Sequence, residues 1–328
     1  MKPILFTSAC LYKPNEITLY GHHRERFNSI TLGGAAQFEL VFCTERPDFY
    51  IKIKDVINPE SLSYYISNLS FHFSNETISF SELTLQFPFE KCSIDLSNPN
   101  ASIISTLCKN YSHRLDEWIQ YHLKLGFSGI VIFNNGGNIS SGLNESLENT
   151  VFDKSMEQIA SNYDGRVFLV DFPYGPFPYD HWNNIQRASL TIGVNAFREK
   201  CRFISLTDAD EFIYLPANPT QNIEDFLQSH NRTIKMHSNV LTNHGANDVI
   251  NNNVLELAKY VGEDKYTKAI LCTSFINENE FIITPHEHGS QLTLGKDVII
   301  HYHCWLNERY GHNDSMQKIE FLNAFLST

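Results

Sequence analysis

The chain has 328 residues, of which 42% are hydrophobic, and its 25 Lys and Arg face 37 Asp and Glu, so the formal net charge is −12. Such a composition excludes a disordered chain, and at about 100 to 200 residues per domain we expect two domains. The acidic balance argues against a nucleic-acid partner, because nucleic-acid binding depends on Lys and Arg contacts to phosphate. It also argues against adhesion to anionic lipid through charge alone.

The cysteines and the hydropathy pattern predict a soluble, cytoplasmic protein. The 7 cysteines are odd in number and contain no Cys-x-x-Cys pair, which favours neither a disulfide framework nor a structural zinc site. Residues 1–14 lack a signal-peptide core, and no window approaches the roughly 18 uninterrupted apolar residues of a membrane span. We expect no transmembrane segment. Peripheral contact with the cytoplasmic face of a membrane, and oligomerisation, stay open.

The first part of the chain has the pattern of antiparallel β-structure. Short apolar runs at 38–43, 49–56, 69–73 and 83–87 are separated by turn residues, and Ile51 and Ile53 alternate with lysines. The Asn, Pro and Ser residues of 97–102 favour a connector. We therefore predict a β-rich N-terminal accessory domain at 1–98, with a role in glycan binding or oligomerisation.

The remainder, 99–328, is predicted to be an α/β domain. Apolar strands at 103–108, 129–134, 166–172 and 201–206 alternate with helical patterns near 115–125 and 182–198. Strands joined by helical crossovers of this length pair in parallel and are covered on both faces. Gly126 follows the first helical pattern as a C-terminal cap.

Three acidic residues, Asp208, Asp210 and Glu211, follow the strand predicted at 201–206. Ligands of open α/β sheets bind at the carboxyl ends of strands. In extended geometry Asp208 and Asp210 point the same way and can share one hard cation or a cation-bridged phosphate. The Asp-x-Asp tripeptide on its own is equally compatible with an acidic turn at the surface.

The segment 105–135 together with 208–212 resembles glycosyltransferase family 92 and its bacterial and viral relatives. The residues that match the family pattern in order are Lys109, Asn110, Glu117, Trp118, Tyr121, His122, Gly126, Asn134, Asn135, Asp208, Asp210, Glu211 and Phe212. The resemblance covers about 102–310 and implies a GT-A fold, which is a Rossmann-like mixed sheet that binds nucleotide-diphospho-sugars. It also implies inverting transfer from a UDP-sugar. Two departures lie near the expected nucleotide pocket: Tyr111 replaces the usual Glu, and no Asp follows Asn135.

The resemblance further implies a divalent cation, Mn²⁺ or Mg²⁺, which stabilises the charge that develops on a departing diphosphate. Asp210 is the first choice as a ligand, Asp208 a ribose or second metal contact, and Glu211 a supporting carboxylate. A C-terminal His often completes such sites. Four candidates lie close together in the sequence, in the order of preference His301, His288, His303, with His286 beside them. A zinc site formed by these histidines stays open.

Other expected contacts rest on the same resemblance. The predicted nucleotide contacts are Lys109, Asn110, Glu117, Asn134, Asn135, Gln186, Asp208 and Lys268. Arg187 could offer charge to a phosphate. For Gln186 and Arg187 a solvated helix face is the alternative, and Lys268 could equally be solvated. Trp118 lies on the apolar helix stripe and is expected to be a core residue. Inversion requires a carboxylate general base, for which Asp248 and Glu287 are the candidates.

The sequence thus predicts a metal-dependent inverting glycosyltransferase that moves a hexose, with galactose as the first guess, from a UDP-hexose to a glycan acceptor. One alternative is a non-catalytic carbohydrate-binding protein with a degenerate transferase domain. A second is a metal-dependent hydrolase, which is the weaker hypothesis because no His-x-x-Glu-His type of motif occurs.

Overall fold

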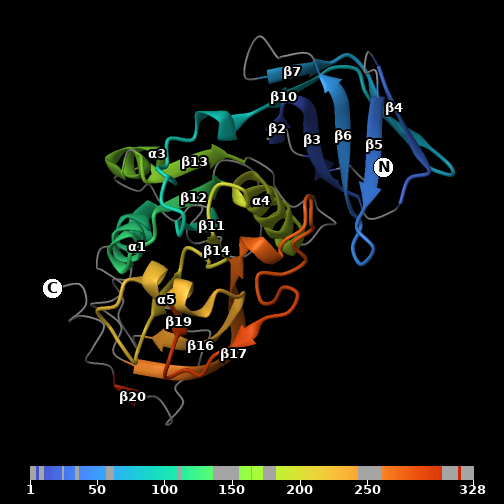
Figure 1. Cartoon of the computed structure of the whole chain (residues 1–328). Helices are drawn as coiled ribbons and strands as arrows, with labels where there is room; N and C mark the ends of the chain where they lie inside the picture. The colour runs from blue at the N-terminus through green and yellow to red at the C-terminus, as the bar shows by residue number, and fades with distance from the viewer. Residues whose placement is uncertain are drawn as a thin grey trace.

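The structure, a computed structural model, describes 5–6, 11–23, 26–33, 37–56, 63–108, 112–135, 155–163, 165–172, 182–242, 260–304 and 317–318. Two parts lie side by side in Figure 1: an N-terminal set of β-strands, and a larger part in which helices cover a mixed sheet. The sheets of the described residues separate near the boundary expected from the sequence, since the N-terminal strands end at Gln86 and the large sheet begins at Ser102.

The N-terminal strands pair only antiparallel, as the alternating sequence pattern predicts. One sheet has the order β1-β3-β6-β5, with β2 beside β3; the others are β4-β8-β9 and β10-β7. Their bounds are β1 Leu5–Phe6, β2 Leu11–Lys13, β3 Asn15–His22, β4 Ser29–Leu32, β5 Gln37–Phe42, β6 Asp48–Val56, β7 Ser63–Ile66, β8 Leu69–His72, β9 Thr77–Phe80 and β10 Leu83–Gln86.

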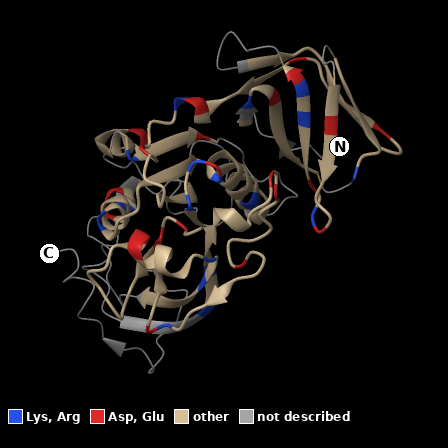
Figure 2. Ribbon diagram, in the orientation of Figure 1, with Lys and Arg blue, Asp and Glu red and all other residues tan. Residues whose placement is uncertain are grey.

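Strand β6 shows why this part folds as it does. Ile51 and Ile53 are buried, whereas Lys54 is exposed and pairs with Glu39 of β5 at 3.2 Å. Figure 2 shows the charged bands on β5 and β6. The apolar face packs on a cluster of aromatic rings in which Phe27 meets Phe49 and Phe71 edge-on at 5.0 Å. The predicted half-buried strand is confirmed.

The larger part contains a ten-stranded mixed sheet with the order β13-β12-β11-β14-β17-β16-β19-β15. The strands expected at the start of this part are present, and β11, β12, β13 and β14 pair in parallel, which confirms the parallel pairing predicted from the sequence. The bounds are β11 Ser102–Cys108, β12 Gly129–Asn134, β13 Val167–Asp171, β14 Phe203–Ser205, β15 Glu211–Tyr214, β16 Ile234–Thr242, β17 Tyr260–Cys272, β18 Leu292–Thr293, β19 Ile300–Cys304 and β20 Gln317–Lys318.

Helices cover both faces of the parallel strands. Helix α1 packs on one face, where Ile104 and Ile130 belong to its core cluster, and α4 packs on the other, where Ile103 and Val131 belong to a second cluster. Strands buried on both faces explain the continuous apolar runs in the sequence. The helices are α1 Ser112–Leu125, α3 Met156–Ala160, α4 Trp182–Phe197 and α5 Ile223–His230, with 3₁₀ turns η1 Pro88–Lys91, η2 Ser161–Tyr163 and η3 Thr273–Phe275.

Glu224, in the first turn of α5, ties that helix to the start of the parallel strands. Its Oε1 accepts hydrogen bonds from the backbone N of Ser102 at 2.8 Å and from the hydroxyls of Ser102 and Ser128 at 3.0 and 2.6 Å. Asn222 caps the same helix by accepting from the backbone N of Glu224 at 2.8 Å. These contacts hold α5 at the end of the sheet opposite the carboxyl ends of the strands.

Of the helices in the described part of the chain, none combines the length and the apolar character that a bilayer crossing requires.

Gly126 ends α1, as the sequence predicts, with a φ of +110°. A Cβ at this position would collide with the side chain of Asn222. We predict that Gly126→Ala lowers the free energy of unfolding by about 2 to 4 kcal/mol, since it adds backbone strain and a steric clash. Urea unfolding at pH 7.5 measures the loss.

Gly289→Ala is the matched control. Gly289 has a φ of +54°, and nothing lies within 4 Å of a Cβ added there. This variant carries only the left-handed backbone cost of about 1 kcal/mol. Equal losses in the two variants would contradict the packing assigned to Gly126.

Candidate functional site

The acidic residues form a turn between two buried strands rather than an extended segment. The backbone N of Glu211 donates to the carbonyl oxygen of Asp208 at 3.1 Å, and the backbone N of Asp208 donates to the Glu211 carboxylate at 3.0 Å. We call residues 208–211 the acidic turn. The extended geometry predicted for Asp208 and Asp210 is therefore wrong, because these hydrogen bonds fold the segment and the two carboxylates meet different partners.

Asp208 contacts the side chains of two residues predicted from the sequence. Its Oδ1 accepts from the Gln186 amide of α4 at 2.8 Å, and its Oδ2 forms a close ion pair with Lys268 of β17. Its side chain keeps 33% of its surface exposed. Loss of solvation raises the pKa of Asp208, and the nearby Glu211 and Asp210 add to this, although the positive charge of Lys268 opposes it.

Lys268 is buried rather than solvated, with 3% of its side chain exposed. Its ammonium lies 3.2 Å from Glu211 Oε2 as well as against Asp208. Burial on its own would lower the pKa of Lys268, but the two carboxylates outweigh burial and raise it. Lys268 is thus an internal cation shared by Asp208 and Glu211.

Asp210 pairs with His303 of β19, whose Nε2 lies 3.1 Å from Asp210 Oδ2. Burial on its own would lower the pKa of His303, but the Asp210 carboxylate outweighs it and raises that pKa to about 9. Burial likewise opposes ionisation of Asp210, yet the charge of His303 prevails and the pKa of Asp210 is lowered. Asp210 and His303 are 29% and 16% exposed, so both members of this pair are accessible, whereas the Lys268 partner of Asp208 is buried.

Of the other candidates, His301 contacts Glu211 of the acidic turn, whereas His288 and Glu287 pair with residues outside it. His301 is completely buried, and its Nδ1 is 3.6 Å from Glu211 Oε1 rather than beside Asp210. His288 pairs with Glu280 at 3.0 Å, and Glu287 is exposed and pairs with Lys235 at 3.1 Å. Asp248 lies outside the described residues. The histidine ranked third from the sequence is thus the one that contacts Asp210.

The asparagines lie where β12 ends. Asn134 donates to Glu157 of α3 at 2.8 Å, while Asn135 is buried and donates to the carbonyl oxygen of Phe172 at 2.7 Å. Glu117 lies on α1 and is partly exposed. Lys109, Asn110 and Tyr111 lie outside the described residues. Because β11, β12 and β14 are parallel, the segments that follow them leave the sheet at one edge.

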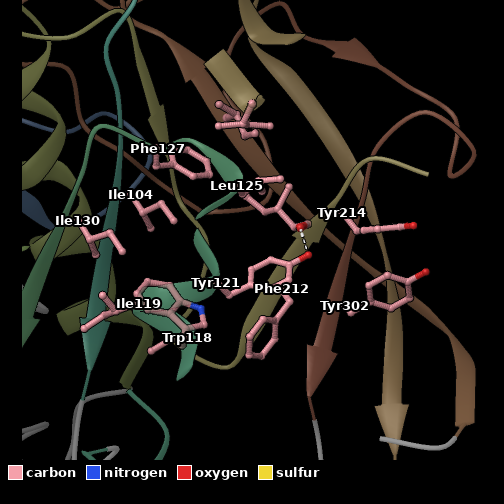
Figure 3. Packing of buried hydrophobic residues seen from close by; sticks show 14 of the residues in the cluster. Ile104, Trp118, Ile119, Tyr121, Leu125, Phe127, Ile130, Phe212, Tyr214 and Tyr302 are labelled. Carbon is pink, nitrogen blue, oxygen red and sulfur yellow. Dashed lines mark hydrogen bonds between the residues drawn. The ribbon is translucent and has the colours of Figure 1, made fainter. Parts of the chain in front are cut away.

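Several aromatic residues of the matched pattern donate hydrogen bonds to the backbone at the acidic turn and in β15. The indole Nε1 of Trp118 donates to the carbonyl oxygen of Glu211 at 2.8 Å, and the Tyr121 hydroxyl donates to that of Ile213 at 2.7 Å. Figure 3 shows Trp118 and Tyr121 pointing from α1 toward Phe212 of β15. Trp118 is a core residue, as predicted; sequence reasoning missed its hydrogen bond.

His122 completes this support. Its Nδ1 lies 2.9 Å from the carbonyl oxygen of Trp118, and its Nε2 accepts from the backbone N of Ile213 at 3.4 Å. Burial lowers the pKa of His122 to about 3. The polar atoms at 118, 121 and 122 follow helical spacing, which is the signal from which this role could have been inferred.

Arg187 faces away from the acidic turn. It is buried, and its Nε lies 3.3 Å from Asp48 Oδ2 of β6 in the N-terminal sheet. Neither the solvated helix face nor the phosphate contact considered for Arg187 fits this burial and pairing.

The donor set offers one pair with the chemistry of a hard-cation site. Within the described residues, no group of three His, Cys, Asp or Glu side chains is arranged to hold a metal ion. Both oxygens of Asp208 are engaged by Gln186 and Lys268, whereas Asp210 offers a carboxylate and His303 an imidazole once a cation displaces its proton. This combination suits Mn²⁺ better than Mg²⁺, with phosphate and water oxygens as further ligands.

Comparison with known proteins gives a partial similarity. No protein-family model matches the chain. A protein of Oryza sativa subsp. japonica, named as a glycosyltransferase family 92 protein, is 24% identical over 127 residues, or 39% of this chain. The chain matches only 18% of the length of that relative. Among solved structures, Cwp6 from Clostridium difficile aligns with 63% of this chain and 46% of its own at 11% identity and a TM-score of 0.22.

The similarity to the rice protein is therefore confined to one stretch of the chain. The likeness to Cwp6 is too low to inform the fold or the function.

Lys268→Met tests the internal cation. The variant leaves Asp208 and Glu211 facing each other without the ammonium, so we expect the free energy of unfolding to fall by about 3 to 5 kcal/mol. Lys265→Met, an exposed position on the same strand, should change it by less than about 0.5 kcal/mol. Urea unfolding of both variants at pH 7.5 makes the comparison. A loss below 1 kcal/mol for Lys268→Met would refute the shared-cation geometry.

The burial of His122 in its neutral form predicts that the free energy of unfolding decreases at acidic pH. The unfolded residue takes up a proton near pH 6.5, whereas the folded residue stays neutral until about pH 3, so stability falls as the pH drops below 6.5. Between pH 7.5 and 5.5 this contribution amounts to about 1.4 kcal/mol. His122→Asn should lose that much less than wild type over the same interval in urea unfolding. Parallel pH profiles of the two proteins would contradict the buried neutral imidazole.

Proposed function

We propose that the chain transfers a hexose from a nucleotide-diphospho-sugar to a glycan acceptor, and that residues 99–328 form a GT-A type of domain. The observation that carries the proposal is the similarity to a protein named as a family 92 glycosyltransferase, together with the polar residues gathered around the acidic turn. The acidic turn follows β14, on the edge of the sheet where ligands of α/β proteins bind.

We propose different roles for Asp210 and Asp208 of the acidic turn. Asp210 with His303 would hold the divalent cation, Mn²⁺ or Mg²⁺, whose positive charge stabilises a departing diphosphate. Asp208 is held in place by Lys268 and Gln186, and its exposed surface suits a contact to a ribose or sugar hydroxyl. His301 and His288 stay predictions as ligands, and the contacts of this structure favour His303 over both.

The proposed reaction is a single displacement with inversion. The acceptor hydroxyl oxygen bonds to the anomeric carbon while the bond to the diphosphate oxygen breaks, and a carboxylate takes the hydroxyl proton. Asp248 and Glu287 remain the proposed bases; Glu287 is 60% exposed, which leaves it accessible to an acceptor. UDP-galactose is the first donor to test.

The test uses the purified full chain with a panel of UDP-hexoses, Mn²⁺ and glycan acceptors, and follows UDP release. We expect metal-stimulated release with at least one donor, and a loss of about 100-fold or more in kcat for Asp210→Asn. Asp225→Asn, an exposed acidic residue in the first turn of α5, should keep wild-type turnover. Full turnover in Asp210→Asn would refute the proposed role.

A thermal-shift series with UDP and Mn²⁺ separates the carbohydrate-binding alternative from the enzyme. Glycan binding with no turnover, and no stabilisation by millimolar UDP and Mn²⁺, would favour the non-catalytic protein.

A further inference from the structure

Four side chains, three of them buried, connect the N-terminal sheet to helix α4. His22 of β3 and Asp48 of β6 meet Asn184 and Arg187, which lie three residues apart on α4. We call these residues the interdomain network. Three of the side chains are almost fully enclosed, since Asp48 and His22 each have 2% of the side chain exposed and Arg187 has 9%, and Asn184 is half-buried.

The four residues of the network form a closed circuit of hydrogen bonds, in which each donor faces an acceptor. His22 Nδ1 donates to Asp48 Oδ1 at 2.7 Å, and Arg187 Nε donates to Asp48 Oδ2 at 3.3 Å. Arg187 Nη2 donates to Asn184 Oδ1 at 2.5 Å, and Asn184 Nδ2 donates to His22 Nε2 at 3.2 Å.

This circuit assigns a neutral His22 protonated on Nδ1, because Nε2 faces an amide donor. The buried charges are then one carboxylate and one guanidinium, which balance. If His22 were protonated on both nitrogens, its Nε2–H would face the Asn184 amide N–H. Two donors cannot form a hydrogen bond with each other, so the circuit would be broken.

Apolar packing surrounds the network. The ring of Tyr50, which lies on β6, stacks on Phe281 with centroids 4.1 Å apart, and Tyr20 of β3 lies 6.2 Å from the same ring. Both tyrosines belong to the core cluster that contains Phe133 and Leu206 of the large sheet. The contact between the two parts is therefore a shared core, unlike the polar, mobile contact of linked domains.

Helix α4 connects this core to the acidic turn. It contacts β2 and β3 of the N-terminal sheet and β11 of the large sheet, and in Figure 1 it lies between the two parts. Gln186 is the residue next to Arg187, and consecutive side chains on a helix point about 100° apart. Arg187 thus reaches Asp48 while Gln186 reaches Asp208 Oδ1 at 2.8 Å. A rotation or slide of α4 would move the Gln186 amide away from Asp208.

We propose that the N-terminal sheet positions the acidic turn: the interdomain network fixes the rotation and height of α4, and α4 holds Asp208 through Gln186. His22, Asp48, Asn184 and Arg187 are positioning residues. The accessory role expected for residues 1–98, in glycan binding or oligomerisation, stays a prediction beside this one. The positioning of Asp208 by the network does not depend on the proposed function. Its importance for catalysis rests on the proposed function.

The test measures amide hydrogen exchange of peptides that span the acidic turn in the full chain. Asn184→Ala removes two contacts of the network and leaves the Asp48 charge pair in place. We expect exchange at 206–212 to become about tenfold faster. Gln186→Ala should do the same, and the double variant should add nothing further, because both changes act through one contact.

Lys13→Met is the control. Lys13 of β2 pairs with Glu278 at 2.7 Å and with Glu199, which follows the end of α4, at 3.5 Å; these exposed contacts also join the two parts but are not contacts of the interdomain network. The Lys13→Met variant should leave amide hydrogen exchange in the acidic turn unchanged. Arg187→Lys keeps the positive charge but loses the fork of donors that reaches both Asp48 and Asn184, and it serves as the second variant if Asn184→Ala does not fold.

Three results would overturn the proposal: unchanged exchange in the turn for a folded network variant, full additivity with Gln186→Ala, or an equal effect from Lys13→Met. Global unfolding of each variant, followed in urea, separates local loosening from loss of stability. Hydrogen exchange needs no substrate, so its outcome is independent of the glycosyltransferase proposal. If the chain turns over a UDP-hexose, Asn184→Ala should lower kcat when it is introduced into the wild-type chain. The same change should not lower kcat further in a chain that already carries Gln186→Ala.

Discussion

The structure around the acidic turn depends on one buried ammonium group. Lys268 has 3% of its side chain exposed, and its charge is shared by Asp208 and Glu211, which lie at the two ends of the turn. Two carboxylates brought this close would repel each other, and removing them from water would favour their neutral forms. The ammonium compensates for both effects, so the turn can keep charged groups at the end of a buried strand. The remaining acid, Asp210, does not contact this ammonium and pairs with the partly exposed His303.

Two helices hold this arrangement from opposite faces of the sheet. Helix α1 supplies Trp118, Tyr121 and His122, whose polar atoms bind the backbone of β15 directly behind the turn. Helix α4 supplies Gln186, and α4 is itself fixed against the N-terminal sheet through Asp48. The candidate site thus combines a rigid support, made of buried hydrogen bonds, with a partly exposed Asp210–His303 pair. Such rigid support is what a site requires if it is to stabilise developing charge without reorganising.

Local patterns predicted the elements but not the contacts between distant segments. The strands near 103–108 and 129–134, the helix near 115–125 and its ending at Gly126 follow from apolar spacing and from one glycine. The proximity of Asp208, Gln186 and Lys268 was suggested only by the family resemblance, because these residues come from the turn after β14, from α4 and from β17. The partner of Asp210 could not be chosen from the sequence, since His301 and His303 share one face of β19 and the turn geometry decides which is nearer. Arg187 was misjudged because nothing local reveals that Asp48, which lies in the N-terminal sheet, is buried beside it.

If the proposed function holds, the acidic turn binds a divalent cation together with a nucleoside diphosphate. Titration calorimetry of Mn²⁺ into the full chain, with and without saturating UDP, measures this binding. We predict one Mn²⁺ per chain in the presence of UDP, much weaker binding without it, and loss of that site in the Asp210→Asn variant. Mn²⁺ binding that neither depends on UDP nor changes in Asp210→Asn would contradict the account.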